Sequence, residues 1–253
     1  MTNVLAIAQK ELRSYFASPI GYVIVGLFAL LFGWFFYAYL GFFVRSSEQM
    51  MMGGRTPNLN QDMVRGVLLN SAVIILFVMP MITMRTYSEE KRSGTIELLL
   101  TSPVSDVQII LGKFFGAMGL YAAMLGVTLL YIAILFWYGN PEWKPIAAGY
   151  LGLLLMGGCF VSMGLLVSSL TKNQIVAGIG TFALFLFLWV INWIGETAGP
   201  VGREIVSYLS ITEHFDDFAR GVIDTKHLVY YLSFITFGLF LTAKSVDSER
   251  WRG

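Results

Sequence analysis

The sequence predicts an all-α integral membrane protein with six transmembrane helices. Hydrophobic residues make up 56% of the 253 residues and charged residues only 13%, whereas charged residues are about 25% of an average soluble protein. A helix needs about 20 mostly apolar residues to cross a bilayer. The apolar runs are continuous and do not alternate as membrane β-strands do. We expect the six spans at residues 20–44, 64–84, 107–138, 146–170, 175–194 and 228–243.

Charge and cysteine content exclude several other classes of protein. The 17 basic and 16 acidic residues nearly cancel, so the chain has no basic field for binding nucleic acid. The single cysteine, Cys159, excludes an internal disulfide and a cysteine-rich metal site, and we interpret it as a packing residue. The spans carry essentially no ionisable residue, whereas ion-coupled carriers and intramembrane enzymes need one at membrane depth.

The basic residues indicate the orientation of the spans. An even number of spans places both termini on one side of the membrane. Cytoplasmic termini put ten basic residues inside, namely Lys10, Arg13, Arg85, Lys91, Arg92, Lys113, Lys172, Lys244, Arg250 and Arg252. The seven outside are Arg45, Arg55, Arg65, Lys144, Arg203, Arg220 and Lys226. This positive-inside bias predicts that both termini are cytoplasmic.

Residues 1–19 are expected to form an amphipathic helix at the membrane–water interface. On a helical wheel one arc is apolar, with Val4, Leu5, Ala8, Leu12, Tyr15 and Phe16. The opposite side carries Gln9, Lys10, Arg13 and Ser14. Asn3 is suited to cap the helix at its start, and Pro19 separates it from the first span. Such a helix is typical of the bilayer surface; the alternative is a soluble helix that packs on another domain.

The stretch 85–106 is the largest predicted cytoplasmic loop and carries the densest charge cluster. Glu89 and Arg92 are spaced as an i,i+3 pair on a helix that continues from the second span. Gly94 allows that helix to stop sharply, and a capping box that begins at Ser105 opens the third span. We therefore expect a helix, a break, a short helix, a second break and a helix.

The short helix between these breaks is predicted over residues 95–100. Thr95 is suited to cap it, and Pro103 ends it. Three successive leucines follow Glu97, and they cannot all face lipid or a protein core. We expect some of them to contact a partner protein on the cytoplasmic face. The alternative is a charged loop that merely reverses the chain.

The stretch 197–226 is too apolar for a free outer loop. It begins with the turn 199–202, and we expect two short helices packed into or onto the outer leaflet. The acidic and histidine side chains at 213–217 suggest a metal site, but a carboxylate-rich helix that faces water is the interpretation we prefer.

The loop 88–103 resembles the signature of ABC-2 type transporter permeases. The sequence is most similar to the gliding-motility-associated permease subunit (GldF-like). Other segments with this resemblance are 18–22, 113–116 and 213–225. The resemblance covers nearly the whole chain and implies one ABC-2 type transmembrane domain over residues 1–253. It also implies a dimer of two permease copies, either identical or paralogous.

The resemblance further implies that stretch 85–106 contains a coupling helix that docks on a separate ABC ATPase. It assigns this contact to Glu89, Glu90, Arg92, Gly94, Thr95, Glu97, Leu98, Leu99, Leu100 and Pro103. It assigns Lys10, Leu12 and Arg13 to the interfacial helix. It assigns His214, Phe215, Asp216, Arg220 and Gly221 to re-entrant helices within 197–226.

No phosphate-binding loop of the ABC ATPases occurs in the chain, since Gly112-Lys113 is followed by Phe114. ATP and Mg²⁺ would therefore be bound by the partner ATPase, and this chain is expected to be neither an enzyme nor a metal protein.

The resemblance implies an exporter subunit in the bacterial inner membrane, surrounded by lipid. The alternatives are a membrane subunit that transmits force to an envelope accessory protein without transport, and an ion-coupled carrier or channel. Substrate, direction and the choice between homodimer and heterodimer stay open.

Overall fold

The computed structural model describes residues 2–50, 57–96, 104–197 and 208–250. Within these ranges every regular element is a helix, and six helical segments are long and apolar enough to cross a membrane. This confirms the predicted all-helical fold with six candidate transmembrane helices. The spanning helices are α2 (Pro19–Met50), η1 with α3 (Leu59–Val64 and Arg65–Thr83), α6 (Asp106–Tyr138), α7 (Trp143–Ser169), α8 (Gln174–Thr197) and α11 (Thr225–Arg250).

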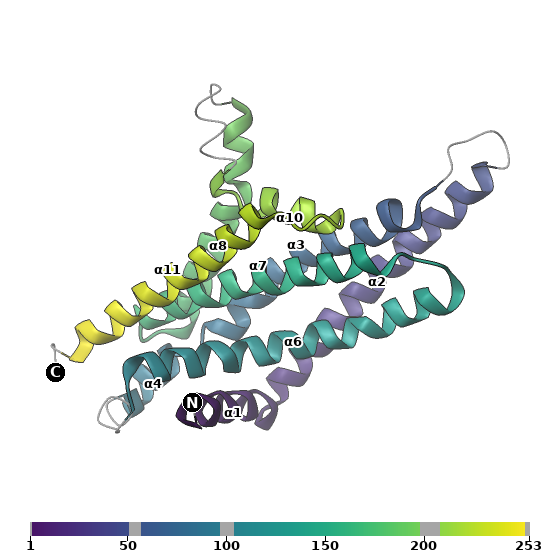
Figure 1. The fold of residues 1–253 in the computed structure, drawn as a ribbon. Helices are drawn as coiled ribbons and strands as arrows, with labels where there is room; N and C mark the ends of the chain where they lie inside the picture. The colour runs from purple at the N-terminus through teal and green to yellow at the C-terminus, as the bar shows by residue number, and fades with distance from the viewer. Residues whose placement is uncertain (1, 51–56, 97–103, 198–207, 251–253) are drawn as a thin grey trace.

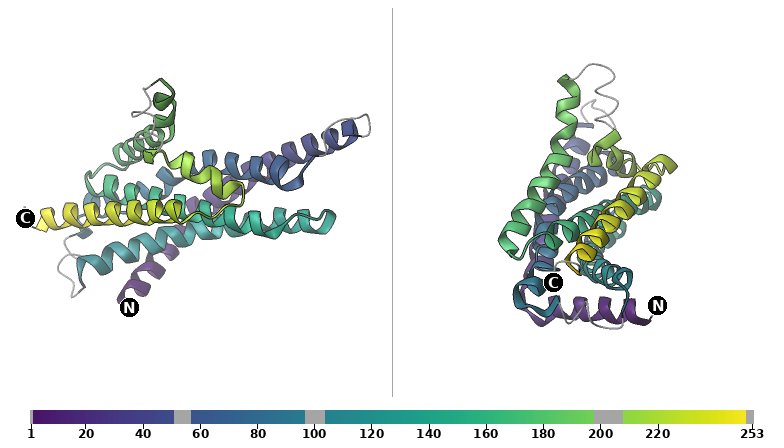
Figure 2. Two further views of the ribbon diagram at one scale, coloured as in Figure 1. Left: turned by 45° about the horizontal axis from the view of Figure 1, so that its top comes forward. Right: turned by 90° about the vertical axis from the view of Figure 1, so that its left-hand side faces the viewer.

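The long helices run alternately between two ends of the molecule (Figure 1). We call one the basal end: it holds α1 (Thr2–Ala17), α4 (Ser88–Ser93) and the end of α11. The distal end holds η1, the turn between α6 and α7, and α10 (Ile211–Ala219). In Figure 2 α1 lies across the foot of the bundle. The described parts of the first helix, α1, and of the end of α11 therefore lie on the same, basal side.

Several helix boundaries differ from the predicted ones for local reasons. The last helix is longer than the predicted 228–243, because it continues through the polar residues 244–250, beyond the apolar run on which the prediction was based. Pro80 lies within α3, as the predicted span 64–84 allows, and Met84 N donates to the Pro80 carbonyl at 2.9 Å. Asn3 lies inside α1 and does not precede it. The predicted capping box is confirmed: Ser105 N donates to Gln108 Oε1 at 3.3 Å, and the Ser105 side chain accepts from the Gln108 backbone.

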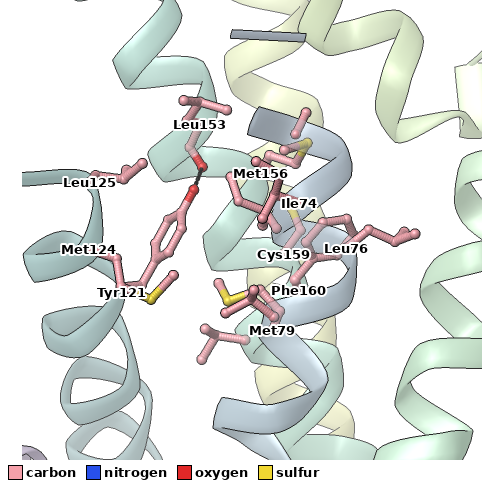
Figure 3. Close-up of a cluster of buried hydrophobic side chains, with 14 of the residues drawn as sticks. Ile74, Leu76, Met79, Tyr121, Met124, Leu125, Leu153, Met156, Cys159 and Phe160 are labelled. Atoms are coloured by element: carbon pink, nitrogen blue, oxygen red, sulfur yellow. Dashed lines mark hydrogen bonds between the residues drawn. The ribbon is translucent and has the colours of Figure 1, made fainter. Parts of the chain in front are cut away.

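The central core is formed where α3, α6 and α7 meet (Figure 3). The Tyr121 hydroxyl of α6 donates to the Leu153 carbonyl of α7 at 2.7 Å. Gly157 makes room for the Tyr121 ring, because a Cβ at that position would overlap it. Cys159 is fully buried among these side chains, as expected of a packing residue. Small residues thus let the spans approach closely, as they do in other membrane bundles.

A row of glycines on α6 forms the surface on which α1 packs. A Cβ at Gly112 would lie 2.6 Å from Ile7 Cβ, and one at Gly116 would lie 2.5 Å from Glu11 Cβ. The buried face of α1 keeps most of the predicted apolar arc but is shifted toward Ile7 and Glu11, so that Leu5 is 68% exposed while Glu11 is 9% exposed. The burial of a carboxylate in preference to a leucine needs a compensating charge, and α6 supplies it.

Candidate functional site

Lys113 of α6 is the charge at the centre of the basal end. It is 1% exposed, and its Nζ lies 2.7 Å from Glu90 Oε1 and 3.1 Å from Glu11 Oε1. Nζ also donates to the Thr86 carbonyl at 2.8 Å. Three acceptors thus match the three donors of an ammonium group. The prediction that the spans carry essentially no ionisable residue is therefore wrong at Lys113. This buried cation lies inside the apolar run of α6, which begins before it.

Lys113, Glu11 and Glu90 form what we call the basal ion cluster. Each comes from a different helix: Glu11 from α1, Glu90 from α4 and Lys113 from α6. Lys10 Nζ adds a second positive charge 3.7 Å from Glu90 Oε1. Buried charges are tolerated when they are paired and hydrogen-bonded, and removal of one partner is strongly destabilising. The cluster therefore holds α1 and α4 to the same point of α6.

The start of α4 is also attached to the end of α7. Ser168 Oγ accepts from the backbone amides of Tyr87 and Ser88, each at 3.1 Å. The Lys91 ammonium donates to the Ser169 carbonyl. Because the first amides of a helix have no partner within it, the Ser168 hydroxyl acts as an external cap for α4. Helix α4 is thus fixed on one side by α6 and on the other by α7.

The chain leaves α4 at Gly94, which has φ 73° and closes the helix in the left-handed conformation. The predicted stop at this glycine is confirmed, and its conformation favours glycine because a Cβ is disfavoured there. Thr95 Oγ1 then lies 2.8 Å from Ser93 Oγ. The predicted short helix at 95–100 lies mostly outside the described residues, as do Glu97, Leu98, Leu99, Leu100 and Pro103.

The other predicted coupling residues occupy two different environments. Glu89 pairs with Arg85, one helical turn before it, through a 3.1 Å contact between Arg85 Nε and Glu89 Oε2. The expected pairing of Glu89 with Arg92 is therefore replaced by one with Arg85, and Arg92 is exposed. Glu90 points inward to Lys113. Glu89 and Arg92 thus lie at the surface of α4, while Glu90 belongs to its attachment.

A pocket of about 250 Å³ lies between α1 and α4, and Lys10, Arg85 and Glu89 contribute to its walls. Of the other residues predicted on the interfacial helix, Leu12 packs beside Gly119 of α6 and Arg13 is exposed. The hydroxyl of Tyr15 donates to the Ile82 carbonyl at 3.0 Å. Burial raises the pKa of the Tyr15 phenol, so it stays a neutral donor.

The distal end carries a second polar cluster, between α10 and α11. His214 Nδ1 lies 2.6 Å from His227 Nδ1, and His227 Nε2 lies 2.8 Å from Asp217 Oδ2. His214 is 6% exposed and Phe215 is fully buried. The expectation that this segment faces water is therefore wrong for one side of α10, which packs on α7 at Gly152. Among the described residues, no group of three or more His, Cys, Asp or Glu is arranged to hold a metal ion.

The remaining predicted residues of this region position α10. Asp216 accepts from Arg65 at the start of α3 and contacts Arg220, each at 2.6 Å. Gly221 has φ 90°, and a Cβ there would lie 2.8 Å from the backbone Cα of Pro145. This turn therefore needs glycine for both conformation and space.

The basal ion cluster was not predicted from the sequence. Glu11 and Lys113 are separated by 102 positions, so no local spacing connects them. Two signals were present: Glu11 borders the apolar arc of the first helix, and Lys113 lies six residues after the start of the predicted span 107–138. A charge in each of these places needs a partner.

Comparison with known proteins identifies a family and two relatives. The profile of the family described as "ABC-2 family transporter protein" matches residues 5–243. Two curated proteins, from Escherichia coli strain K12 and from Escherichia coli O157:H7, share the name "Probable multidrug ABC transporter permease YbhR". Each is 27% identical over 180 residues, which cover 70% of this chain and 48% of the relative. The chain thus spans about half the length of the curated relatives it matches.

Proposed function

The chain belongs to the ABC-2 family of transporter proteins, and we propose on this basis that it is a permease subunit driven by a separate ABC ATPase. The observation that carries the proposal is the attachment of α4. This short helix lies at the basal end, directly before the stretch 95–103, and is fixed to α1, α6 and α7. A contact made just after Gly94 would therefore act on several helices together.

The proposed mechanism needs no nucleotide chemistry in this chain. The stretch 95–103 docks on the ATPase, with Glu89 and Arg92 as surface charges beside it. Closure of an ATPase dimer on ATP moves the docked stretch, and the basal ion cluster makes α1 and α6 follow α4. Helix α6 has 33 residues, so it carries this displacement over about 50 Å. Rigid-body motion of packed helices is a common way to transmit such a change.

The orientation and assembly follow from the same proposal. The basal end is cytoplasmic, because it docks the ATPase, and both termini lie on that side of a bacterial inner membrane. Helix α1 lies in the membrane–water interface. Two permease copies form the pathway. The relatives' name describes multidrug permeases, which favours export of apolar or amphipathic molecules. Membership in the gliding-motility branch is a finer proposal, supported by the similarity at 213–225.

The first test is recovery of the ATPase with the permease. The tagged full chain is extracted from its own host in mild detergent, and the proteins that copurify are identified by mass spectrometry. We expect an ABC ATPase with the native chain and its loss with the double variant Glu97→Arg, Leu99→Asp. The matched control is Val222→Asp with Lys226→Glu, which makes a similar change at exposed positions of the distal end.

Retention of the ATPase by a folded Glu97→Arg, Leu99→Asp variant would contradict the proposal that the stretch 95–103 docks on the ATPase. Absence of an ATPase with the native chain would contradict the permease function itself and favour a carrier or channel. Where the ATPase is recovered, export of an amphipathic dye from proteoliposomes distinguishes a transporter from a subunit that only transmits force.

A further inference from the structure

His214, His227 and Asp217 form a continuous chain of hydrogen bonds, which we call the distal histidine cluster. It starts at the Tyr208 carbonyl, 2.9 Å from His214 Nε2. It continues through the 2.6 Å contact between the two Nδ1 atoms and ends at Asp217, 2.8 Å from His227 Nε2. The cluster joins α10 to the first turn of α11.

The hydrogen bonds determine how many protons this cluster holds. A carbonyl oxygen only accepts, so His214 Nε2 must carry a proton. The contact between the two Nδ1 atoms needs one proton, as does the contact between His227 and the Asp217 carboxylate. Three hydrogen bonds therefore hold three protons, whichever atom of each pair carries the proton. Two imidazoles and a carboxylate with three protons have no net charge, a state that suits a buried site.

One state satisfies all three hydrogen bonds with ordinary donors and acceptors. His214 is neutral, with its proton on Nε2, and its Nδ1 accepts from His227 Nδ1. In this arrangement His227 Nδ1 donates the middle hydrogen bond, and the third proton lies between His227 Nε2 and Asp217 Oδ2. The ring of Tyr230 stacks on His214 with centroids 3.8 Å apart, which keeps the imidazole in this orientation.

A fourth proton is incompatible with this geometry. The free lone pair of the two imidazoles is at His214 Nδ1, and it accepts the hydrogen bond from His227. Protonation there would place two N–H groups against each other across 2.6 Å. It would also give a partly buried cluster a net positive charge. The hydrogen bond between α10 and α11 would then be replaced by a repulsion.

The surroundings of His214 favour the neutral form. Its pKa is lowered by burial and by the neighbouring charges of His227 and Lys226, while the Tyr208 carbonyl and Glu213 act in the opposite direction. Asp216, on the same helix, is neutralised by Arg65 and Arg220. Helix α7 meets α10 through Gly152. The tyrosine rings that face His214 are those of Tyr208, Tyr230 and Tyr231.

We infer that the distal histidine cluster is a proton-binding latch, which holds α10 on α11 at neutral pH and releases it when His214 takes up a proton. In the orientation proposed above, the latch faces the outer side of the membrane and responds to acidity there. The latch itself does not depend on that orientation or on an ATPase partner.

The direction and the size of the latch's pH dependence follow from proton linkage. The closed state binds the fourth proton more weakly than the open state, in which His214 has an ordinary pKa of about 6.5. Below that pH the open state binds more protons than the closed state, so acidification favours opening. Between about pH 6.5 and the lowered pKa of the closed state, the opening equilibrium rises up to tenfold for each unit of acidification.

Hydrogen exchange read by mass spectrometry tests the latch in the full chain, reconstituted in lipid nanodiscs. Protection of the α10 amides is measured from pH 8 to pH 5 and corrected for the intrinsic pH dependence of exchange. We expect the native protection of α10 to fall by up to tenfold per unit below about pH 6.5, while the amides of α7 keep their protection and show that the protein stays folded.

Two variants remove the titrating group in different ways. His214→Asn keeps an acceptor near the position of Nδ1, and His214→Gln keeps a donor near the position of Nε2, so at least one is expected to keep α10 in place. Each should abolish the fall of α10 protection on acidification, which we call the acid step. The matched control is Glu213→Gln, at an exposed neighbouring position, which removes a carboxylate and should keep the step.

The latch is refuted by native α10 protection that does not change between pH 8 and pH 5. It is equally refuted if both His214 variants retain the native acid step, because the step would then come from another group. Neither outcome bears on the ATPase partner, so the latch and the proposed function fail separately.

Discussion

Replacement of Lys113 by methionine tests the basal ion cluster most directly. The variant keeps an unbranched side chain of similar length but removes the ammonium group. Glu11 and Glu90 are then left near each other without the cation that each now contacts, at 3.1 and 2.7 Å. Removal of one partner from a buried ion pair costs about 3–5 kcal/mol.

The expected loss is large enough to measure in the solubilised protein. For a chain of 150–250 residues, each kcal/mol shifts the Tm by about 2–4 °C, so Lys113→Met should lower it by roughly 6–20 °C. Thermal unfolding is followed by circular dichroism or differential scanning fluorimetry in detergent. Because the cluster attaches α1, hydrogen exchange of the α1 amides should increase at temperatures at which α7 is still protected.

The control is the triple variant Lys113→Met, Glu11→Gln, Glu90→Gln. It removes all three charges together and leaves no buried carboxylate unpaired. Replacement of a complete buried ion pair by hydrophobic residues of similar volume is often close to neutral in stability; the two glutamines carry no charge, so we expect a substantial part of the loss to be recovered. Our reasoning would be refuted if Lys113→Met unfolded within about 2 °C of the native protein, or if the triple variant were no more stable than the single one.

Three further substitutions test packing and hydrogen bonding elsewhere. Gly116→Val should displace α1, because a Cβ there would lie 2.5 Å from Glu11 Cβ of that helix. We expect the free energy of unfolding to fall by about 1–3 kcal/mol and the α1 amides to exchange faster. Native exchange of these amides would contradict the packing of α1 on the glycines of α6. Gly221→Ala should cost at least about 1 kcal/mol of the free energy of unfolding, because its φ is 90° and Pro145 is 2.8 Å away. Gly126→Ala on α6, where a Cβ has open space, is the control and should not lower the Tm. Tyr121→Phe removes the hydrogen bond to the Leu153 carbonyl and should cost about 1 kcal/mol; an unchanged Tm would show that this bond contributes nothing.

The all-helical fold, the number of candidate spans and several local breaks could be predicted from the amino-acid sequence. The spans are defined by apolar runs, and the cost of exposing polar backbone in lipid makes such runs helical wherever they occur. The capping box at Ser105 and the stop at Gly94 were equally predictable. Each depends on residues within one helical turn, and their hydrogen bonds or backbone angles are decided locally.

Tertiary structure alone decided which distant charges meet. The sequence placed Glu11 on a helix and Lys113 in a span, but their pairing depends on α1 crossing α6 at its glycine row. Likewise, His214 became a buried hydrogen-bonding group because α10 lies against α11. Hydrophobicity and capping are properties of short segments, whereas the environment of a buried charge is set by the helices that surround it. The basal ion cluster and the distal histidine cluster, on which our proposals rest, are therefore features that only the packed bundle reveals.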